Sequence, residues 1–282
     1  MYRIQLDPGP WAQYVKRADN IGLPLHEVSK KYMMESNLYA TQLFESLQQQ
    51  QSMQSAVSAG GSAPASTPST PHVEGVDFTI EWFINANAWG SHPRPFSLGA
   101  YPAPNAVSIE GSGNDFYWWT NGSFKVNASS LNLHTGSWYH MAVTRNNGVL
   151  GAYINGQLLA TGSYTASIPA GNNNLTIGAE PGDSYVNGYI TNFRWTADVL
   201  YTGASFTVPT SPLTATANTK LLLLATTGSS AYTDSSALAQ TVTNVSSSWN
   251  NKSPFSGSVG GSISFNGTSA YITVPSGSVW NL

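Results

Sequence analysis

The chain has no cysteine, and only 9% of its residues are charged, against about 25% in an average soluble domain. Without cysteine it has no disulfide framework, no thiolate zinc site and no cysteine nucleophile. With 11 Lys and Arg against 14 Asp and Glu, it lacks the basic surface that nucleic-acid binding requires. It also lacks an apolar run of about 18 residues, so no membrane-spanning helix is expected.

The charges that are present are distributed unevenly along the chain. Residues 1–60 hold five basic and five acidic residues, whereas the 222 residues that follow hold only six and nine. Between the two parts, Ser58 to Pro71 consists entirely of small residues and proline, which is typical of a linker without a core. We therefore predict a helical arm over 1–57, a linker over 58–74 and a second domain over 75–282.

Apolar residues in the arm recur at helical spacing, with steps of three, four and seven positions. An isolated helix with one apolar stripe would leave that stripe in water, so it is expected to pack on copies of itself or on another protein. A trimer is the favoured oligomer, and the alternative is a helix folded back on the chain's own domain. The predicted assembly residues are Leu25, Val28, Tyr32, Tyr39, Leu43 and Leu47.

After the linker, short runs of β-branched and aromatic residues alternate with Gly, Asn, Ser and Pro clusters, which is typical of an antiparallel sandwich. The clearest unit is a hairpin from Trp138 to Gly156. Within it, Asn147 and Gly148 supply the positive-φ residues of a tight turn between two alternating strands.

Several of these strands resemble those of laminin-G-like domains in the concanavalin A-like lectin/glucanase superfamily. The resemblance lies in FTIEW at 78–82, WYHMAVTR at 138–145 followed by YING at 153–156, and GYITNFRW at 188–195. It implies a mainly β, antiparallel jelly-roll sandwich. The segments at 200–209 and in the arm are also similar to those of tailed-phage (marine or cyanophage) virion proteins.

The order of segments departs from the resembling family. Strands that open the family's module appear here at the end of the chain, at 220–224, 262–267 and 271–275. Either the domain is circularly permuted, with 220–282 supplying its opening strands, or the chain ends in half of a second module. We favour permutation, because unpaired apolar strands at a free end would promote aggregation.

Motifs for catalysis are missing from the sequence. The family's glycosidases carry two catalytic carboxylates on one strand in a Glu-x-Asp-x-x-Glu run, and this chain has no such run. No serine elbow, zinc-binding HExxH or phosphate-binding loop occurs either. Glu81 is interpreted as a structural residue, and we expect the protein not to be an enzyme. No cofactor is expected, although Asp115 and Asp183 in Gly/Asn-rich loops are candidate Ca²⁺ ligands.

The strongest candidate for ligand binding is an aromatic strand. Aromatic rings stack on the apolar faces of sugars, and neighbouring Asn and Asp groups bond hydroxyls. The alternative is that these rings pack under a loop, in a copy of the chain or against a neighbouring protein. The predicted carbohydrate-binding residues are Asn114, Asp115, Tyr117, Trp118 and Trp119.

Two functions follow as expectations. The first is a phage virion structural protein, located on the outer surface or tail, whose arm docks on other virion proteins. The alternative is a lectin module that binds a host receptor or surface glycan. A glycan-degrading enzyme is a third and weaker interpretation.

Overall fold

The computed structural model describes residues 76–90, 92–99, 105–110, 113, 115–120, 123–167, 173–180, 182–256 and 260–280. The predicted arm, its assembly residues, the linker and Asn114 lie outside these ranges. No helix in the described ranges is long and apolar enough to cross a membrane.

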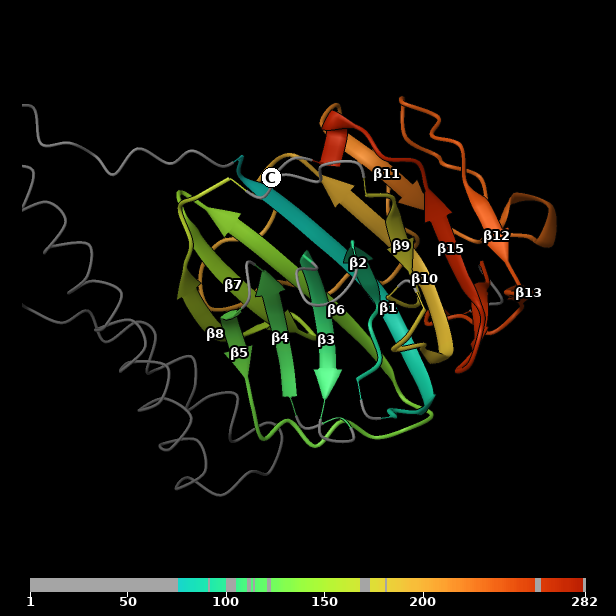
Figure 1. Cartoon of the computed structure of the whole chain (residues 1–282), viewed down its shortest axis with the longest axis horizontal. Helices are drawn as coiled ribbons and strands as arrows, with labels where there is room; N and C mark the ends of the chain where they lie inside the picture. Colours follow the sequence, from blue (N-terminus) through green and yellow to red (C-terminus); the bar gives the residue numbers. More distant parts are fainter. Residues whose placement is uncertain are drawn as a thin grey trace, which may run out of the picture. The chain divides into compact units, whose positions relative to one another are not determined.

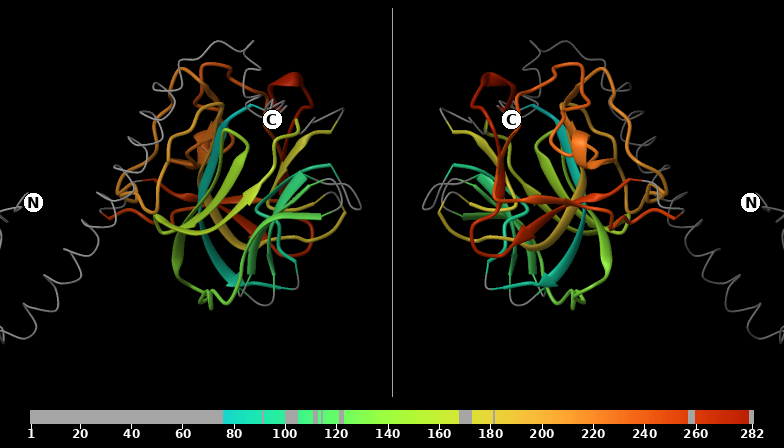
Figure 2. Two further views of the ribbon diagram at one scale, coloured as in Figure 1. Left: turned by 90° about the vertical axis from the view of Figure 1, so that its left-hand side faces the viewer. Right: turned by 90° about the vertical axis from the view of Figure 1, so that its right-hand side faces the viewer.

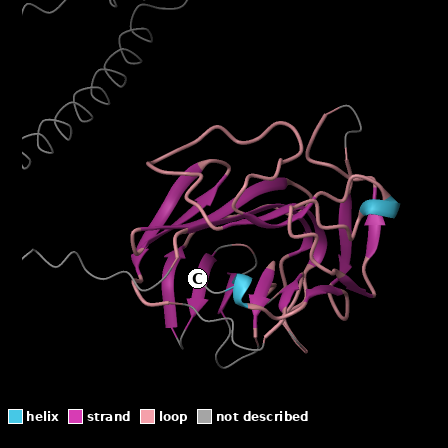
Figure 3. Ribbon diagram, turned by 90° about the horizontal axis from the view of Figure 1, so that it is seen from above, coloured by secondary structure: helices cyan, strands magenta, loops and turns pink. Residues whose placement is uncertain are grey.

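The described residues form two antiparallel sheets packed face to face, as the two side views and the view from above make visible (Figures 2 and 3). The mainly β sandwich predicted from the sequence is therefore confirmed. The first sheet, called sheet A, has the order β13-β14-β10-β1-β6-β7-β8, with β11 also paired to β10. Its strands are β1 (Phe78–Ala88), β6 (Trp138–Asn146), β7 (Val149–Ile154), β8 (Gln157–Ser163), β10 (Asn187–Thr196), β11 (Thr219–Leu223), β13 (Ser248–Asn250) and β14 (Ser262–Asn266).

The second sheet, called sheet B, lies in front of sheet A in Figure 1 and has the order β12-β15-β9-β2-β3-β4-β5. Two short 3₁₀ helices, at Gly228–Ser230 and Ser278–Trp280, complete the described elements. The strands of sheet B are β2 (Phe96–Leu98), β3 (Asn105–Glu110), β4 (Asp115–Thr120), β5 (Ser123–Ala128), β9 (Leu175–Ile177), β12 (Thr243–Val245) and β15 (Tyr271–Val274).

Large aromatic rings fill the space between the sheets. Trp82 of β1 meets Phe96 of β2 edge to face, with ring centroids 5.6 Å apart, and Phe96 also contacts Trp118 of β4 at 5.7 Å. Edge-to-face pairs of this kind add about 0.5–1.5 kcal/mol each to the area that they bury. All three rings are shielded from solvent, so the core holds the two sheets in a fixed relation.

The hairpin predicted from the sequence is formed by β6 and β7. Their pairing runs from Met141 opposite Ile154 to Asn146 opposite Val149. Asn147, in the turn, has a φ of 48°, as a tight primed turn requires.

Strands from the last quarter of the chain join both sheets. β11 and β14 pair with β10 in sheet A, and β15 pairs with β9 in sheet B. Ile263 and Ile272, which these strands contribute, belong to the common core. The permuted order relative to the family stays a prediction.

Both faces of the central strand β1 are covered. Ile80 and Trp82 point into the core, while Thr79 and Glu81 alternate with them and point to the opposite, outer face of sheet A. All four are buried. Ile80 and Trp82 lie in the core, whereas Thr79 and Glu81 are covered by the segment between β10 and β11, which crosses that outer face. Thr79 Oγ1 donates to the carbonyl of Asp198 in this segment at 2.9 Å. The outer face of sheet A is therefore a layered surface, on which hollows can form between strands and crossing segment.

Candidate functional site

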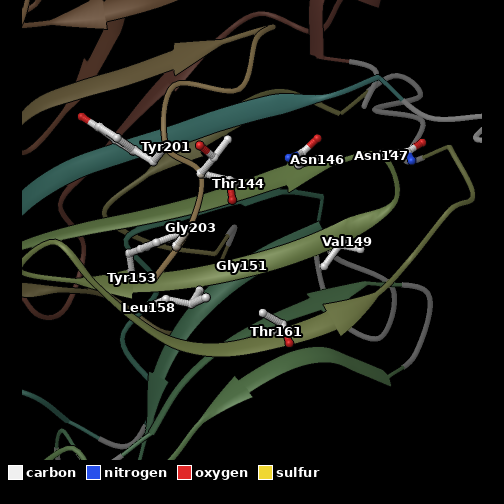
Figure 4. Close-up of a pocket in the computed structure, with 11 residues that line it drawn as sticks. Thr144, Asn146, Asn147, Val149, Gly151, Tyr153, Leu158, Thr161, Tyr201 and Gly203 are labelled. Carbon is white, nitrogen blue, oxygen red and sulfur yellow. The ribbon is translucent and has the colours of Figure 1, made fainter. Parts of the chain in front are cut away.

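A hollow of about 450 Å³ opens on the outer face of sheet A, over strands β6, β7 and β8 (Figure 4). This volume lies within the range of about 300–1,000 Å³ that is typical of small-molecule sites. We call it the first hollow. It is lined by Thr144, Asn146, Asn147, Val149, Gly151, Tyr153, Leu158, Thr161, Tyr201, Thr202 and Gly203.

The floor of the first hollow is set by a glycine in the middle of β7. A Cβ atom on Gly151 would lie 3.0 Å from Cε2 of Tyr153, 3.1 Å from Oγ1 of Thr144 and 3.2 Å from Cδ1 of Leu158. Glycine inside a strand weakens the strand, and it often marks a place where another group approaches closely. Here its missing side chain leaves an opening between a phenol ring, a hydroxyl and an aliphatic group.

One wall of the first hollow belongs to a segment that crosses the β7–β8 turn. We call residues 201–209 the strap. Two backbone hydrogen bonds join the strap to the turn. Phe206 N donates to the carbonyl of Gly156 at 2.8 Å, and Leu158 N donates to the carbonyl of Ala204 at 2.9 Å. Gly156 has a φ of 76°, and a Cβ there would collide with the carbonyl of Phe206. The turn therefore needs glycine both for its geometry and for the contact with the strap.

A buried carboxylate anchors the start of the strap to the sheet. Tyr201 donates its hydroxyl to Oε2 of Glu81 at 2.7 Å, and the ring of Tyr201 stacks on Phe206 with centroids 3.6 Å apart. Arg194 Nε donates to Oε1 of Glu81 at 2.8 Å, and His140 Nε2 lies 3.0 Å from Oε2. Both oxygens of this carboxylate thus interact with side chains of the strap or of neighbouring strands.

Burial alone would raise the pKa of Glu81, but the hydrogen bond from His140 and the charge of Arg194 outweigh it, so the pKa lies below its ordinary value. Burial and the adjacent Glu81 charge in turn raise the pKa of Tyr201. Glu81 is therefore an ionised structural group, as the sequence suggested, and it is shielded from any ligand on the surface.

Residues 59–202 match the model of the concanavalin A-like lectin/glucanases superfamily. The chain belongs to this superfamily. No curated protein matches it. Among solved structures, a Bacteroides ovatus chain described as a proposed carbohydrate-binding protein is 15% identical, with a TM-score of 0.42; 72% of this chain and 54% of that chain are covered.

A second solved structure is domain 4 of AbnA, a GH43 extracellular arabinanase from Geobacillus stearothermophilus, in complex with arabinotriose. It is 20% identical, with a TM-score of 0.36, and 48% of this chain and 64% of that chain are covered. The chain thus spans less than two thirds of either structure.

Within this superfamily domain, the aromatic strand predicted to bind sugar is β4. Trp118 has 0% exposure and packs against Phe78 and Phe96 in the core, so its assignment as a ligand platform is wrong. The neighbouring side chain of Tyr117, which alternates to the other face, is also buried, with 4% exposure. Trp119 and Asp115 are half-buried. None of these residues lines the first hollow.

The two candidate Ca²⁺ ligands lie in different settings. Asp115 begins β4, opposite Glu110, whereas Asp183 is exposed in a tight bridge with Glu180. Within the described part of the chain, no group of three or more His, Asp or Glu residues is arranged to hold a metal ion.

Sequence reasoning missed the residues of the first hollow. They come from three strands and the turn between the first two, and from a strap that begins 40 residues after Thr161, and no motif joins them. The one local signal was Gly151, a glycine inside the otherwise regular strand VLGAYI.

Proposed function

We propose that this domain is a carbohydrate-binding module, and that the first hollow holds the sugar. The observation that carries the proposal is the chemistry of the lining: none of the eleven residues is charged, and hydroxyl and amide groups lie among the apolar parts of Tyr153, Leu158 and Val149. Sugars offer the complementary surface, namely neutral hydroxyls around an apolar ring face. Membership of a superfamily of lectins and glucanases supports the same conclusion.

The lining also favours binding over hydrolysis. A retaining glycosidase needs two carboxyl groups about 5–5.5 Å apart on either side of the scissile bond. No Asp or Glu is among the residues that line the first hollow, and Glu81 is held by Tyr201 and Arg194. We therefore propose a non-catalytic role.

The glycan-binding alternative from the sequence thus becomes the leading interpretation, in place of a structural virion protein. The virion location, the docking arm and the trimer stay predictions from the resemblance and from residues outside the described ranges. The proposal that the first hollow binds sugar does not depend on these predictions.

The test is a binding measurement on the full chain with a panel of neutral trisaccharides: cellotriose, xylotriose, arabinotriose, mannotriose, maltotriose and laminaritriose. Thr202 is exposed at the mouth of the first hollow, so Thr202→Trp should fill it without disturbing the core. We expect at least one sugar to bind, and this variant to weaken its affinity by at least about tenfold.

Thr202→Ser is the matched control and should bind as the unsubstituted chain does. Thermal unfolding of both variants verifies the fold. If no sugar of the panel binds, or if Thr202→Trp binds as well as the unsubstituted chain, the first hollow is not the site.

A further inference from the structure

A second hollow, of about 340 Å³, lies on the other side of the strap. It is separate from the first, since the two share no lining residue. Its walls come from β1, β6, the β7–β8 turn, the end of the strap with the adjoining Thr210, and a loop before β14. The lining residues are Phe83, Trp138, His140, Asn155, Val208, Pro209, Thr210, Pro254, Phe255 and Ser256.

The second hollow differs from the first in holding a half-buried tryptophan. Trp138 begins β6 and alternates with Met141 and Tyr139, so its side chain leaves the strand on the outer face of sheet A, as that of His140 does. Trp side chains combine a large apolar face with a polar edge, and they are favoured at sites where one end stays wet. Its indole is therefore a platform of the kind on which a sugar ring stacks.

Polar groups with spare hydrogen-bonding capacity surround this platform. Asn155 uses its Oδ1 to accept from His140 N–H at 2.9 Å, which fixes the side chain and leaves its amide N–H groups available. Thr210 and Ser256 are exposed and add hydroxyls at the rim. Neutral amides and hydroxyls of this kind match the hydroxyls of a sugar.

His140 forms the closed base of the second hollow. Its Nε2 faces the Glu81 carboxylate, and its side chain has 0% exposure. A group that solvent cannot reach is equally closed to a ligand on the surface. His140 therefore shapes the second hollow, and the hydrogen-bonding groups for a ligand are the exposed ones around it.

We propose that the second hollow is an additional subsite for a neutral sugar, with Trp138 as its stacking platform and the exposed Asn155 and Thr210 as its hydrogen-bonding groups. The inference rests on the proposed carbohydrate-binding function and extends it. The domain then presents two sugar subsites on one sheet face, on either side of a shared strap.

The experiment titrates the same six neutral trisaccharides into the full ¹⁵N-labelled chain and follows the indole N–H of Trp138 and the side-chain amide of Asn155. Trp138→Phe assigns the indole signal. Thr210→Trp should fill the second hollow from its exposed rim, and Thr210→Ser is its matched control. Thr202→Trp, which fills the first hollow, isolates the second.

We expect a trisaccharide to shift both signals in the unsubstituted chain, in Thr202→Trp and in Thr210→Ser. In Thr210→Trp the shifts should disappear and the affinity at this subsite should fall by at least about tenfold. Thermal unfolding of each variant verifies that the fold is retained.

The outcomes separate the two proposals. If sugar binds and Thr202→Trp alone abolishes binding, the proposed function stands and the second subsite is overturned. If Thr210→Trp alone abolishes it, the second subsite stands and the first hollow is not a sugar site. If a trisaccharide binds the full chain but shifts neither signal, only the second subsite is overturned. If no trisaccharide of the panel binds the full chain at all, both are overturned.

Discussion

At the scale of single residues, the same residue type plays opposite roles according to strand parity. Trp118 and Trp138 are both in aromatic-rich strands, yet the first is enclosed between the sheets and the second lies at a hollow. The sequence of β4 allowed both orientations, because Phe-Tyr-Trp-Trp is apolar on both faces. Only packing against Phe78 and Phe96 decides which face is the core.

Replacing Glu81 should strongly destabilise the domain. Glu81→Gln leaves the buried guanidinium of Arg194 without its counter-charge, so we expect a loss of about 3–5 kcal/mol in the free energy of unfolding. Urea unfolding measures this loss. Asp183→Asn, at an exposed carboxylate, is the control and should change stability by less than about 0.5 kcal/mol.

The ionisation of Glu81 makes the free energy of unfolding depend on pH. The pKa of Glu81 is lowered from 4.5, so the unfolded carboxyl takes up a proton at a higher pH than the folded one. Its contribution is complete above the unfolded pKa and is lost as pH falls through the folded pKa. The difference in stability between the unsubstituted chain and Glu81→Gln should therefore shrink below about pH 4.5, and an undiminished difference at low pH would contradict the assignment.

At the scale of elements, local sequence patterns predicted the strands of the hairpin but not the two hollows. The β6–β7 hairpin follows from alternation and from Asn147-Gly148, which are local signals. The first hollow instead depends on the strap reaching the β7–β8 turn, through contacts such as Phe206 to Gly156. Such contacts are set by the folded core and leave no periodic trace in the sequence.

The strap should depend on a single hydroxyl. Tyr201→Phe removes the hydrogen bond to the Glu81 carboxylate, and hydrogen bonds to charged groups contribute about 1.5–3 kcal/mol. We expect this loss in urea unfolding, together with weaker sugar binding at both hollows, which share the strap. Tyr185→Phe is the control, because the Tyr185 hydroxyl has no hydrogen-bond partner in the described ranges. Unaltered binding in Tyr201→Phe would mean that the anchor does not position the strap.

The final strands should be indispensable. Removing residues 262–282 takes β14 from sheet A and β15 from sheet B, and with them the core side chains of Phe265, Ile272 and Trp280. We expect the truncated chain to lose cooperative thermal unfolding and near-ultraviolet circular dichroism. A truncated chain that melts as the full chain does would show that these strands are an independent addition.

At the scale of the whole molecule, the low charge noted at the outset also holds for the residues that line the two hollows. The net charge is −3, and neither hollow is lined by a Lys, Arg, Asp or Glu side chain. Long-range electrostatic attraction therefore contributes little to the encounter with a glycan. This is the electrostatic behaviour expected of a module that recognises neutral sugars.

Binding should accordingly be insensitive to salt. Raising NaCl from about 0.05 to 0.5 M shortens the screening length severalfold, yet we expect the affinity for a neutral trisaccharide to change by less than about twofold. Titration calorimetry at the two salt concentrations measures this. A steep fall with salt would instead indicate an acidic ligand bound by basic groups outside the two hollows.

The strap also offers a place where substitutions can change binding specificity without changing the sandwich. It is an irregular segment laid across a rigid sheet, and it contributes to both hollows side chains that take no part in the aromatic core. Loops held on a stable scaffold tolerate substitution better than the scaffold does. Under the proposed function, exchanges at Thr202 in the strap and at Thr210 directly after it would alter the preferred sugar at each hollow separately, so that evolution could change recognition one subsite at a time while the sandwich is inherited unchanged.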